Sequence, residues 1–443
     1  MQKVISLNNN IYYYSALDNS FYRDEINTNE DKKKQLEQIE FILPLKKKEL
    51  QSLLKNNLSC LIFGITNKCN FKCKYCHYTG VYPELFNENK NLLNINYYAI
   101  YDSLNYFYLH SKDVSVINIG FYGGEPLLEA EKILKIIYKA KKLFGERVKF
   151  SITTNCSLIN NEIASEFVKN NVIICVSLDG PKKIHNKNRI TNTNKETFDI
   201  VIKNLKILKR KYGNKYKELV GFHCVISSLK DLKVVNHFFT NNELTCKNEV
   251  LVSTRYEFGF KEKENTIDIN LHEYKNILNS YINDITADNS PKNKIIHSVF
   301  RKLLLSIIFR EIGYIHNKLV PPGLCIPGTH KAYLDSDLNF YICERVGSIY
   351  PIGDLHNKLD SNLIYDLLKQ YINFFNRYCK RCWAIRFCMN CFASTFDKNG
   401  LSQERLQYSC ESNRSMISDA LYIYCSSLEI NEHSFDNWEF SKE

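Results

Sequence analysis

The sequence predicts an α/β protein in which an open, partial barrel of about six βα units follows a small α+β segment and precedes a cysteine-rich, loop-rich domain. Short apolar runs alternate with segments of helix-forming composition from about residue 60 to residue 254, a pattern typical of parallel βαβ units. The chain has 443 residues, 44% of them hydrophobic, which is enough for two to four packed domains. Many of its 16 cysteines gather in two groups, which scattered core cysteines would not do.

Residues 1–58 form a polar, tyrosine-rich opening followed by a charged stretch. The opening contains Ile11-Tyr12-Tyr13-Tyr14, and the composition of Glu30–Lys55 predicts a helix. The character of the sequence changes at Cys60, where the apolar runs begin. We therefore expect an N-terminal extension over residues 1–58.

The middle of the chain is expected to form the barrel. Strands are predicted at the apolar runs Leu61–Ile65, Val116–Tyr122, Val148–Thr154, Val172–Leu178, Leu219–Ile226 and, more weakly, Val250–Ser253. Helices are predicted between and after them at Tyr97–Leu109, Glu129–Phe144, Asn161–Asn170, Glu196–Lys211 and Leu232–Phe239. Six units are too few to close an eight-stranded barrel. A helical pattern over His272–Ile312 completes a core of residues 59–312, and Pro321-Pro322-Gly323 opens a turn-rich third domain at 313–443.

Charge and hydropathy exclude several classes of protein. The chain has 59 Lys and Arg against 48 Asp and Glu, a net charge of +11, but the basic residues are spread along it and do not indicate nucleic-acid binding. No apolar run reaches the ~18–20 residues that span a membrane, and the N-terminus has no long apolar signal segment. We therefore expect a cytoplasmic protein. Because cytosolic thiols stay reduced, its cysteines indicate metal ligation or catalysis.

The first cysteine group has the spacing Cys69-x3-Cys73-x2-Cys76 and directly follows the first predicted strand. Three thiolates on one loop can hold three irons of a cubane iron–sulfur cluster and leave the fourth iron open to a chelating ligand. A zinc knuckle is the alternative. It normally needs a fourth cysteine or histidine nearby, and His77 is directly adjacent to Cys76, which gives poor zinc geometry.

With Tyr75 just before its last cysteine, this loop resembles that of the radical S-adenosylmethionine (SAM) enzymes. The resemblance implies a [4Fe–4S] cluster whose open iron chelates the methionine moiety of S-adenosyl-L-methionine. An electron from the reduced cluster then cleaves the C–S bond and releases a 5′-deoxyadenosyl radical that abstracts hydrogen. It also implies an external electron donor of the flavodoxin or ferredoxin type.

Further motifs lie at the ends of the next strands, where barrels place their sites. Gly123-Gly124-Glu125-Pro126 ends the second strand; glycines allow close backbone approach, and a carboxylate accepts hydrogen bonds from an ammonium. It resembles the family's GGEP motif, which holds the SAM amino group. The resemblance also implies that Ser177 and Arg189 contact the ribose and carboxylate of SAM. The expected cofactor-binding residues are Tyr75, Gly123, Gly124, Glu125, Asn155, Ser177 and Arg189. Cys156, where relatives generally have Gly, is expected to be a small buried side chain.

The second cysteine group is the tail. Cys325 and Cys343 precede the run Cys379-x2-Cys382-x5-Cys388-x2-Cys391, and Cys410 follows it. This order resembles the SPASM extension, which houses two auxiliary iron–sulfur clusters. The resemblance assigns the second cluster to Cys379, Cys382, Cys388 and Cys410, and the first to Cys325, Cys343 and Cys391. The first is one ligand short, so it has an open iron, takes Cys425 or accepts a substrate thiolate. Leu338 stands where Gly is usual, which puts the local loop geometry in doubt. A zinc ribbon over Cys379–Cys391 is the alternative.

Glu344 follows Cys343, and sulfatase-maturing relatives have an acidic residue near this cluster that takes a proton from the substrate. Glu344 is therefore the candidate catalytic base; the alternative is an ordinary surface glutamate. The resemblance favours a maturase that oxidatively crosslinks a ribosomally made precursor peptide, with residues 1–58 binding its leader by strand addition. An anaerobic sulfatase maturase that forms formylglycine is the second hypothesis. A non-catalytic iron–sulfur or zinc scaffold is the third.

Overall fold

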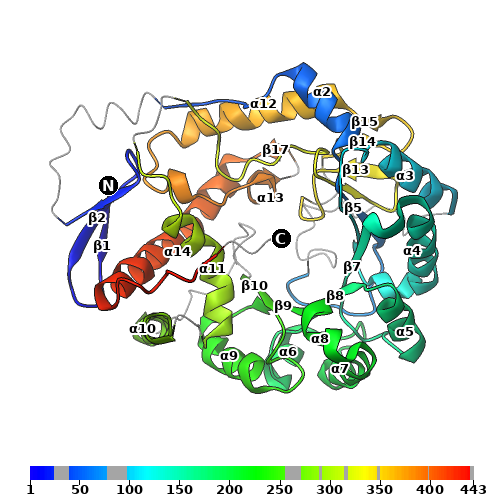
Figure 1. The fold of residues 1–443 in the computed structure, drawn as a ribbon, viewed down its shortest axis with the longest axis horizontal. Coiled ribbons are helices and arrows are strands. Elements are labelled where there is room, and N and C mark those ends of the chain that lie inside the picture. The colour runs from blue at the N-terminus through cyan, green and yellow to red at the C-terminus, as the bar shows by residue number, and fades with distance from the viewer. Residues whose placement is uncertain are drawn as a thin grey trace.

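The computed structural model of the chain describes most of the sequence. The described residues are 1–23, 39–76, 97–254, 271–288, 292–313, 318–346, 350–397 and 399–439. Six parallel strands form the barrel, and Figure 1 shows them on the inner side of an open ring with the early helices outside. These strands are β5 (Cys60–Thr66), β6 (Ile117–Gly123), β7 (Val148–Thr154), β8 (Ile173–Ser177), β9 (Val220–Ile226) and β10 (Val250–Thr254). They confirm the six predicted strands and the partial barrel.

The five predicted helices that follow these strands are confirmed, and two short ones, Lys182–Asn188 and Tyr216–Leu219, were not predicted. They are α3 (Tyr97–Leu109), α4 (Ala130–Phe144), α5 (Asn161–Lys169), α6 (Lys182–Asn188), α7 (Phe198–Tyr212), α8 (Tyr216–Leu219) and α9 (Leu232–Asn241). In α4, Ile133, Ile136, Ile137 and Ala140 are buried, which is the spacing of one helix face. The helical pattern before the tail is confirmed as α10 (Leu271–Asp288) and α11 (Lys294–Ile308).

The barrel core lies between the strands and their helices. Phe63 on β5 is level with Phe121 on β6, whereas Phe150 on β7 is level with Ile119 of β6. All three phenylalanines are buried, and neighbouring ring centroids are 6.5 Å apart. On β9 the buried side chains alternate with half-buried ones such as His223. Because successive strand side chains point to opposite faces, the second set lines the inside of the barrel. On β9 this inner set consists of Gly221, His223 and Val225.

The tail continues the barrel sheet. Strand β12 (Lys331–Leu334) pairs in parallel with β5, and an antiparallel series then extends the sheet to ten strands. The other tail elements are β11 (Lys318–Leu319), β13 (Asn339–Tyr341), β14 (Gly353–Asp354), β15 (Lys358–Leu359), α12 (Ser361–Tyr378), α13 (Phe392–Thr395), β16 (Phe396–Asp397), β17 (Gly400–Leu401) and α14 (Gln403–Ile430). Leu338, in the β12–β13 turn, has a φ of +67°, a conformation that favours glycine. The turn keeps its shape although leucine stands there.

The N-terminal segment is α+β, as predicted. Strands β1 (Gln2–Ile5), β2 (Ile11–Ser15) and β3 (Ser20–Tyr22) form an antiparallel sheet. It lies beside the long α14 (Figure 1), where the Tyr12 hydroxyl donates to Glu429 at 2.7 Å. The sheet therefore belongs to the same packed unit as the tail.

The predicted helix over Glu30–Lys55 is wrong in its middle. Residues 24–38 lie outside the described residues, but Glu40–Phe41 form strand β4, and helix α2 begins only at Lys47 and ends at Asn56. Pro44 explains the difference, because it disfavours helix in the residue before it and lacks a donor N–H. Phe41 is held by Asn376 of α12, through hydrogen bonds of 2.8 Å to both its N–H and its carbonyl. Among the described residues, no helix is long and apolar enough to cross a membrane.

Candidate functional site

The first cysteine group lies on the loop that leaves the carboxyl end of β5. We call residues 67–76 the SAM-cluster loop. Its backbone pairs with a segment beyond β8: the Lys72 N–H donates to the Ile190 carbonyl at 2.7 Å, and the Lys74 N–H donates to the Asn188 carbonyl at 3.0 Å. The loop is therefore held by the barrel and does not depend on a metal for all of its shape.

The three thiols of this loop lie within electrostatic reach of one another. Burial raises the pKa of Cys69 to about 11 and that of Cys73 to about 12, and the nearby Cys76 sulfur adds to both shifts. The Phe71 N–H donates to Cys69 Sγ at 3.4 Å. A metal must displace these protons, because the thiolate is the ligand. His77, the residue considered for zinc, lies outside the described residues.

The Gly123-Gly124 turn presses directly on the SAM-cluster loop. A Cβ atom on Gly123, whose φ is +130°, would lie 2.3 Å from the Thr66 carbonyl oxygen, and one on Gly124 would lie 2.2 Å from that of Lys68. The Gly124 and Glu125 N–H groups donate to these two carbonyls at 2.8 and 2.9 Å. The glycines are thus required for the turn to approach the cysteine loop.

The Glu125 carboxylate is buried and has three donors inside the protein. It accepts from the Leu127 N–H at 3.0 Å, from Thr154 Oγ1 at 2.7 Å and from the Asn155 N–H at 2.7 Å. Burial raises its pKa to about 7, against the opposing effect of these hydrogen bonds. In this structure the carboxylate ties the end of β6 to the end of β7.

Asn155 and the residue after it connect β7 to the SAM-cluster loop. Asn155 Nδ2 donates to Asn70 Oδ1 at 2.9 Å and lies 3.9 Å from Cys69 Sγ. Cys156 is fully buried and has a φ of +64°, so its backbone takes a conformation that glycine adopts easily. Its burial agrees with the small core side chain that we expected.

Arg189 is the most tightly held of the predicted SAM-binding residues. Its Nε lies 3.1 Å from Asp179 Oδ2, and both side chains are buried. Its NH1 lies 3.9 Å from Cys73 Sγ, and its guanidinium carbon lies 5.3 Å from the centre of the Tyr75 ring. The Tyr75 hydroxyl donates to the same Asp179 oxygen. One carboxylate therefore fixes an arginine and a tyrosine beside a ligand thiol.

Asp179 is the residue of this site that the sequence reasoning missed. It lies in the Ser177-Leu178-Asp179-Gly180 segment at the end of β8, and its other oxygen accepts from the Val225 N–H at 3.1 Å. An acidic residue at a barrel strand end, ten residues before an arginine, was the available signal. Ser177 itself is half-buried on the same strand, beside His223 of β9.

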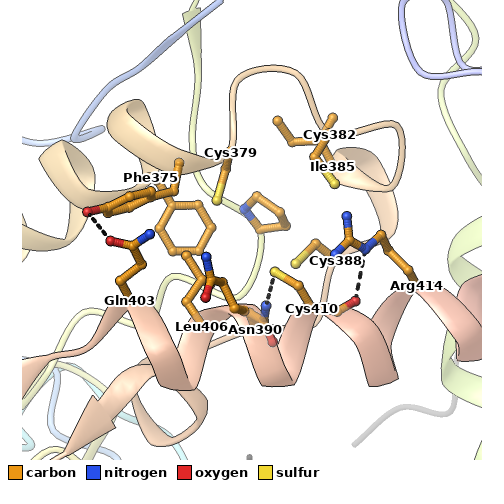
Figure 2. A pocket seen from close by; sticks show the side chains of 13 residues that line it. Phe375, Cys379, Cys382, Ile385, Cys388, Asn390, Gln403, Leu406, Cys410 and Arg414 are labelled. Carbon is orange, nitrogen blue, oxygen red and sulfur yellow. Dashed lines mark hydrogen bonds between the residues drawn. The ribbon is translucent and has the colours of Figure 1, made fainter.

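The tail brings four cysteines together around one cavity, which we call the four-thiol pocket. Figure 2 shows their sulfur atoms on its walls, and its volume is about 170 Å³. Its cysteines are Cys379, Cys382, Cys388 and Cys410. The thiols of Cys388, Cys382 and Cys410 all act on the pKa of Cys379, which burial raises. This is the set that the resemblance assigned to the second auxiliary cluster.

The other three tail cysteines form a separate set, the three-thiol group of Cys325, Cys343 and Cys391. Burial raises the pKa of Cys325 to about 12, and the sulfurs of Cys343 and Cys391 contribute next. Cys425 is elsewhere: it is buried on α14, where Glu429 and Arg310 act on its thiol. The structure therefore does not bring Cys425 to the three-thiol group.

Glu344 lies beside the three-thiol group and is paired with Lys331. The Lys331 Nζ atom is 3.4 Å from Glu344 Oε2, and the glutamate side chain is only 18% exposed. Although burial opposes the charge, Glu344, Cys60 and Cys343 raise the pKa of Lys331. Glu344 is thus half-buried and ion-paired, and Lys331 is a neighbour that the sequence did not indicate.

The donor sets suit iron–sulfur clusters. In the first cysteine group the Phe71 N–H donates to Cys69 Sγ. In the other two groups burial raises the pKa of Cys343 and of Cys388, and the backbone N–H two residues later, of Arg345 and of Asn390, opposes the shift. Such donors stabilise the negative charge of cluster thiolates. Over the described ranges, no three Cys, His, Asp or Glu side chains are arranged around a single metal ion.

Comparison with known proteins identifies the domain that carries the first group. Residues 63–231 match the model of the Radical SAM superfamily. The chain is 24% identical over 386 residues to a cysteine-type anaerobic sulfatase-maturating enzyme of Clostridium perfringens, covering 80% of this chain and 94% of that protein. It is 31% identical over 174 residues to the radical SAM cyclopropyl synthase TigE of Paramaledivibacter caminithermalis, covering 37% of this chain and 34% of that protein.

The fold has a close counterpart among solved structures. The structure of anSMEcpe with bound AdoMet and the Cp18Cys peptide superposes with a TM-score of 0.62 at 19% identity, covering 84% of this chain and 99% of that one. The likeness extends well beyond the superfamily domain, into the cysteine-rich tail.

Proposed function

Because residues 63–231 belong to the Radical SAM superfamily, we propose that this protein is a maturase that cleaves S-adenosyl-L-methionine reductively and oxidises a side chain of a peptide or protein substrate. The observation that carries this proposal is the SAM-cluster loop, whose three thiols meet at the carboxyl end of the barrel beside Arg189. When bound, the cluster and SAM supply a 5′-deoxyadenosyl radical that abstracts hydrogen.

The chain's own residues have distinct tasks in this proposal. Cys69, Cys73 and Cys76 hold the SAM-binding [4Fe–4S] cluster, and the Gly123-Gly124 turn holds their loop in place. Arg189 offers its positive charge to the SAM carboxylate from a position fixed by Asp179. Ser177 and Asn155 stand at neighbouring strand ends, where they can reach the nucleoside.

Oxidation of the substrate removes two hydrogens, and the tail offers acceptors for the second. One hydrogen atom leaves with 5′-deoxyadenosine. The other would leave as a proton, which Glu344 is placed to take, and an electron, for which two auxiliary [4Fe–4S] clusters held by the four-thiol pocket and the three-thiol group would serve as acceptors. Lys331 keeps Glu344 oriented through their ion pair. This electron would balance the one that the external electron donor supplies for SAM cleavage, so the oxidised form of that donor can take it back.

Two substrates are compatible with this chemistry. The relatives favour formylglycine formation: a cysteine loses two hydrogens, water then attacks, and hydrogen sulfide leaves. The three-thiol group favours crosslinking of a precursor peptide, because a group of three leaves an iron to which a substrate thiolate can bind. In crosslinking, two hydrogens leave and the sulfur stays.

The N-terminal sheet supports the crosslinking candidate. Among the described residues, β1 and β3 each pair with β2 alone, so each offers a free edge to which a leader peptide can add as a strand. Ile5 and Ile11 face each other across β1 and β2 and are 52% and 39% exposed. Replacing both by Asp should weaken binding of a labelled precursor peptide. Ile173→Asp, a change at a similarly exposed isoleucine of β8, should not.

Mass spectrometry of two substrates tests the proposal. The protein is reduced anaerobically with SAM and given the Cp18Cys peptide, and is separately coexpressed with a small precursor peptide encoded beside its gene. Loss of sulfur and gain of oxygen in the first would establish formylglycine formation; loss of two hydrogens with sulfur retained in the second would establish crosslinking. No 5′-deoxyadenosine in either reaction would contradict the radical SAM mechanism itself.

A further inference from the structure

We propose that Asn390 is a positioning residue whose side-chain amide donates an N–H···S hydrogen bond to the cluster of the four-thiol pocket and so raises its reduction potential. This inference rests on the proposed function, because it takes the four thiols as cluster ligands. Asn390 stands between two cysteines that belong to different groups: Cys388 lines the four-thiol pocket, and Cys391 belongs to the three-thiol group.

The side-chain amide of Asn390 points at one ligand sulfur, and its backbone N–H acts on a second. Its side-chain Nδ2 donates to Cys410 Sγ at 3.6 Å, which Figure 2 shows on the wall of the pocket. Burial raises the pKa of Cys388 to about 12, and the backbone N–H of Asn390 opposes this shift. The two cysteines come from different parts of the tail, one from the loop before α13 and one from α14. A single residue therefore acts on two of the pocket's ligands.

The surrounding hydrogen bonds fix which way the amide of Asn390 points. Asn413 Nδ2 donates to the Ser409 carbonyl at 3.1 Å, so the atom of Asn413 at this point is its amino group. The same amino group donates to Asn390 Oδ1, as does the Ser409 hydroxyl. Because both neighbours are donors, the Asn390 atom facing them is the oxygen. Its amino group must then face Cys410.

The backbone of Asn390 is equally constrained. Asn390 is only 1% exposed, and its backbone carbonyl accepts a hydrogen bond from the Tyr371 hydroxyl at 3.2 Å. A Cβ atom on Gly323 would lie 2.1 Å from this carbonyl oxygen. Gly323 lies two residues before Cys325 of the three-thiol group. The segment that leads to one group is therefore packed against the residue that donates to the other.

These contacts have a defined electrostatic consequence. Reduction adds negative charge to a cluster, and hydrogen bonds to its sulfurs stabilise that charge more in the reduced state than in the oxidised state. Such a bond in a buried, low-dielectric place raises the potential and favours acceptance of an electron. This is what the proposed function requires of an acceptor for the substrate's second electron.

The variant Asn390→Asp removes the side-chain donor and keeps an oxygen for Ser409 and Asn413. We expect the equilibrium constant for reduction of one auxiliary cluster to fall at least tenfold, which is about 59 mV for a one-electron couple. An anaerobic redox titration followed by electron paramagnetic resonance measures this, with the SAM cluster as internal reference. Asn248→Asp is the matched control: it is also a buried asparagine, but its amide donates to the Tyr216 and Val220 carbonyls.

The outcomes separate this inference from the proposed function. An unchanged potential in Asn390→Asp with full iron content would overturn the role of Asn390 while leaving the clusters in place. Too little iron in the unaltered protein to form auxiliary clusters would instead contradict the proposed function. If the variant loses iron, the unaltered protein labelled with ¹⁵N at asparagine decides: a ¹⁵N coupling to a reduced auxiliary cluster is expected, and its absence would overturn the proposal.

Discussion

Asp179 Oδ2 lies 3.1 Å from Arg189 Nε, with the carboxylate fully buried and the arginine side chain only 7% exposed. Burying a single charge is costly, so each of these residues requires the other. The pair joins the end of β8 to the segment whose backbone pairs with the SAM-cluster loop. The Tyr75 hydroxyl on that loop donates to the same carboxylate. Its position makes the ion pair part of the site's construction.

Asp179→Asn should therefore be strongly destabilising. It leaves the Arg189 charge buried without its partner, which costs about 3–5 kcal/mol, and it should also weaken SAM binding by loosening Arg189. Chemical unfolding and SAM titration measure the two effects. Asp199→Asn, which breaks the exposed pair with Lys182 at 2.6 Å, is the control and should cost far less than Asp179→Asn. Equal effects in the two variants would contradict this account.

Gly124→Ala should displace the SAM-cluster loop. The new methyl group would lie 2.2 Å from the Lys68 carbonyl oxygen, and forcing such an overlap costs about 1–3 kcal/mol or shifts the backbone. We expect reduced iron content and slower 5′-deoxyadenosine formation. Gly221→Ala, where the nearest atom is an ordinary 3.6 Å away, should keep both. A fully loaded Gly124→Ala enzyme would show that the turn does not position the loop.

The cysteines should divide into two functional classes. Cys73→Ala removes a ligand of the SAM-binding cluster and should abolish 5′-deoxyadenosine formation. Cys410→Ala alters only the four-thiol pocket, so SAM cleavage should continue while product formation stops. Quantifying 5′-deoxyadenosine and product in the same reaction distinguishes them. Retained cleavage in Cys73→Ala would refute the radical SAM assignment of this loop.

Glu344→Gln tests the proposed base. The amide cannot accept the substrate proton, so product formation should fall by about 10²–10⁴-fold, while 5′-deoxyadenosine still forms. Glu243→Gln is the control, because that glutamate is also paired with a lysine, Lys209 at 3.4 Å, but on the surface. If Glu344→Gln makes product at the normal rate, another group takes the proton.

Asp419→Asn should stabilise the protein near neutral pH. Burial between α10 and α14 raises the pKa of Asp419 to about 6, although the Tyr274 hydroxyl, 2.8 Å away, opposes the shift. The folded state thus holds a proton that the unfolded state releases, so its stability falls as pH rises from about 4 to 6. Because asparagine does not titrate, the variant should have a free energy of unfolding about 1–3 kcal/mol higher at pH 7.5. Thermal unfolding should show a smaller difference at pH 5, and the reverse trend would contradict the shift.

Much of the fold followed from local pattern. The six barrel strands and the helices after them were predictable because apolar runs of strand length alternate with amphipathic segments, and β7 and α3 have the predicted bounds. The strand at Glu40–Phe41 was not predictable, since Phe41 forms a strand only through β11 and Asn376, which are far away in sequence. Composition cannot show such distant partners.

The sequence by itself determined which thiols of the first group lie together, because spacing within a loop is local: Cys69, Cys73 and Cys76 are grouped whatever the rest of the chain does. Only the tertiary structure decided which polar groups support those thiols. Asp179 reaches Arg189, Lys331 reaches Glu344, and Asn390 reaches Cys410 across separate elements. Such contacts depend on how strands and helices pack, because hydrogen bonds and ion pairs act only over a few ångströms. The partners are far apart in the sequence, so no regular spacing along the chain reveals them.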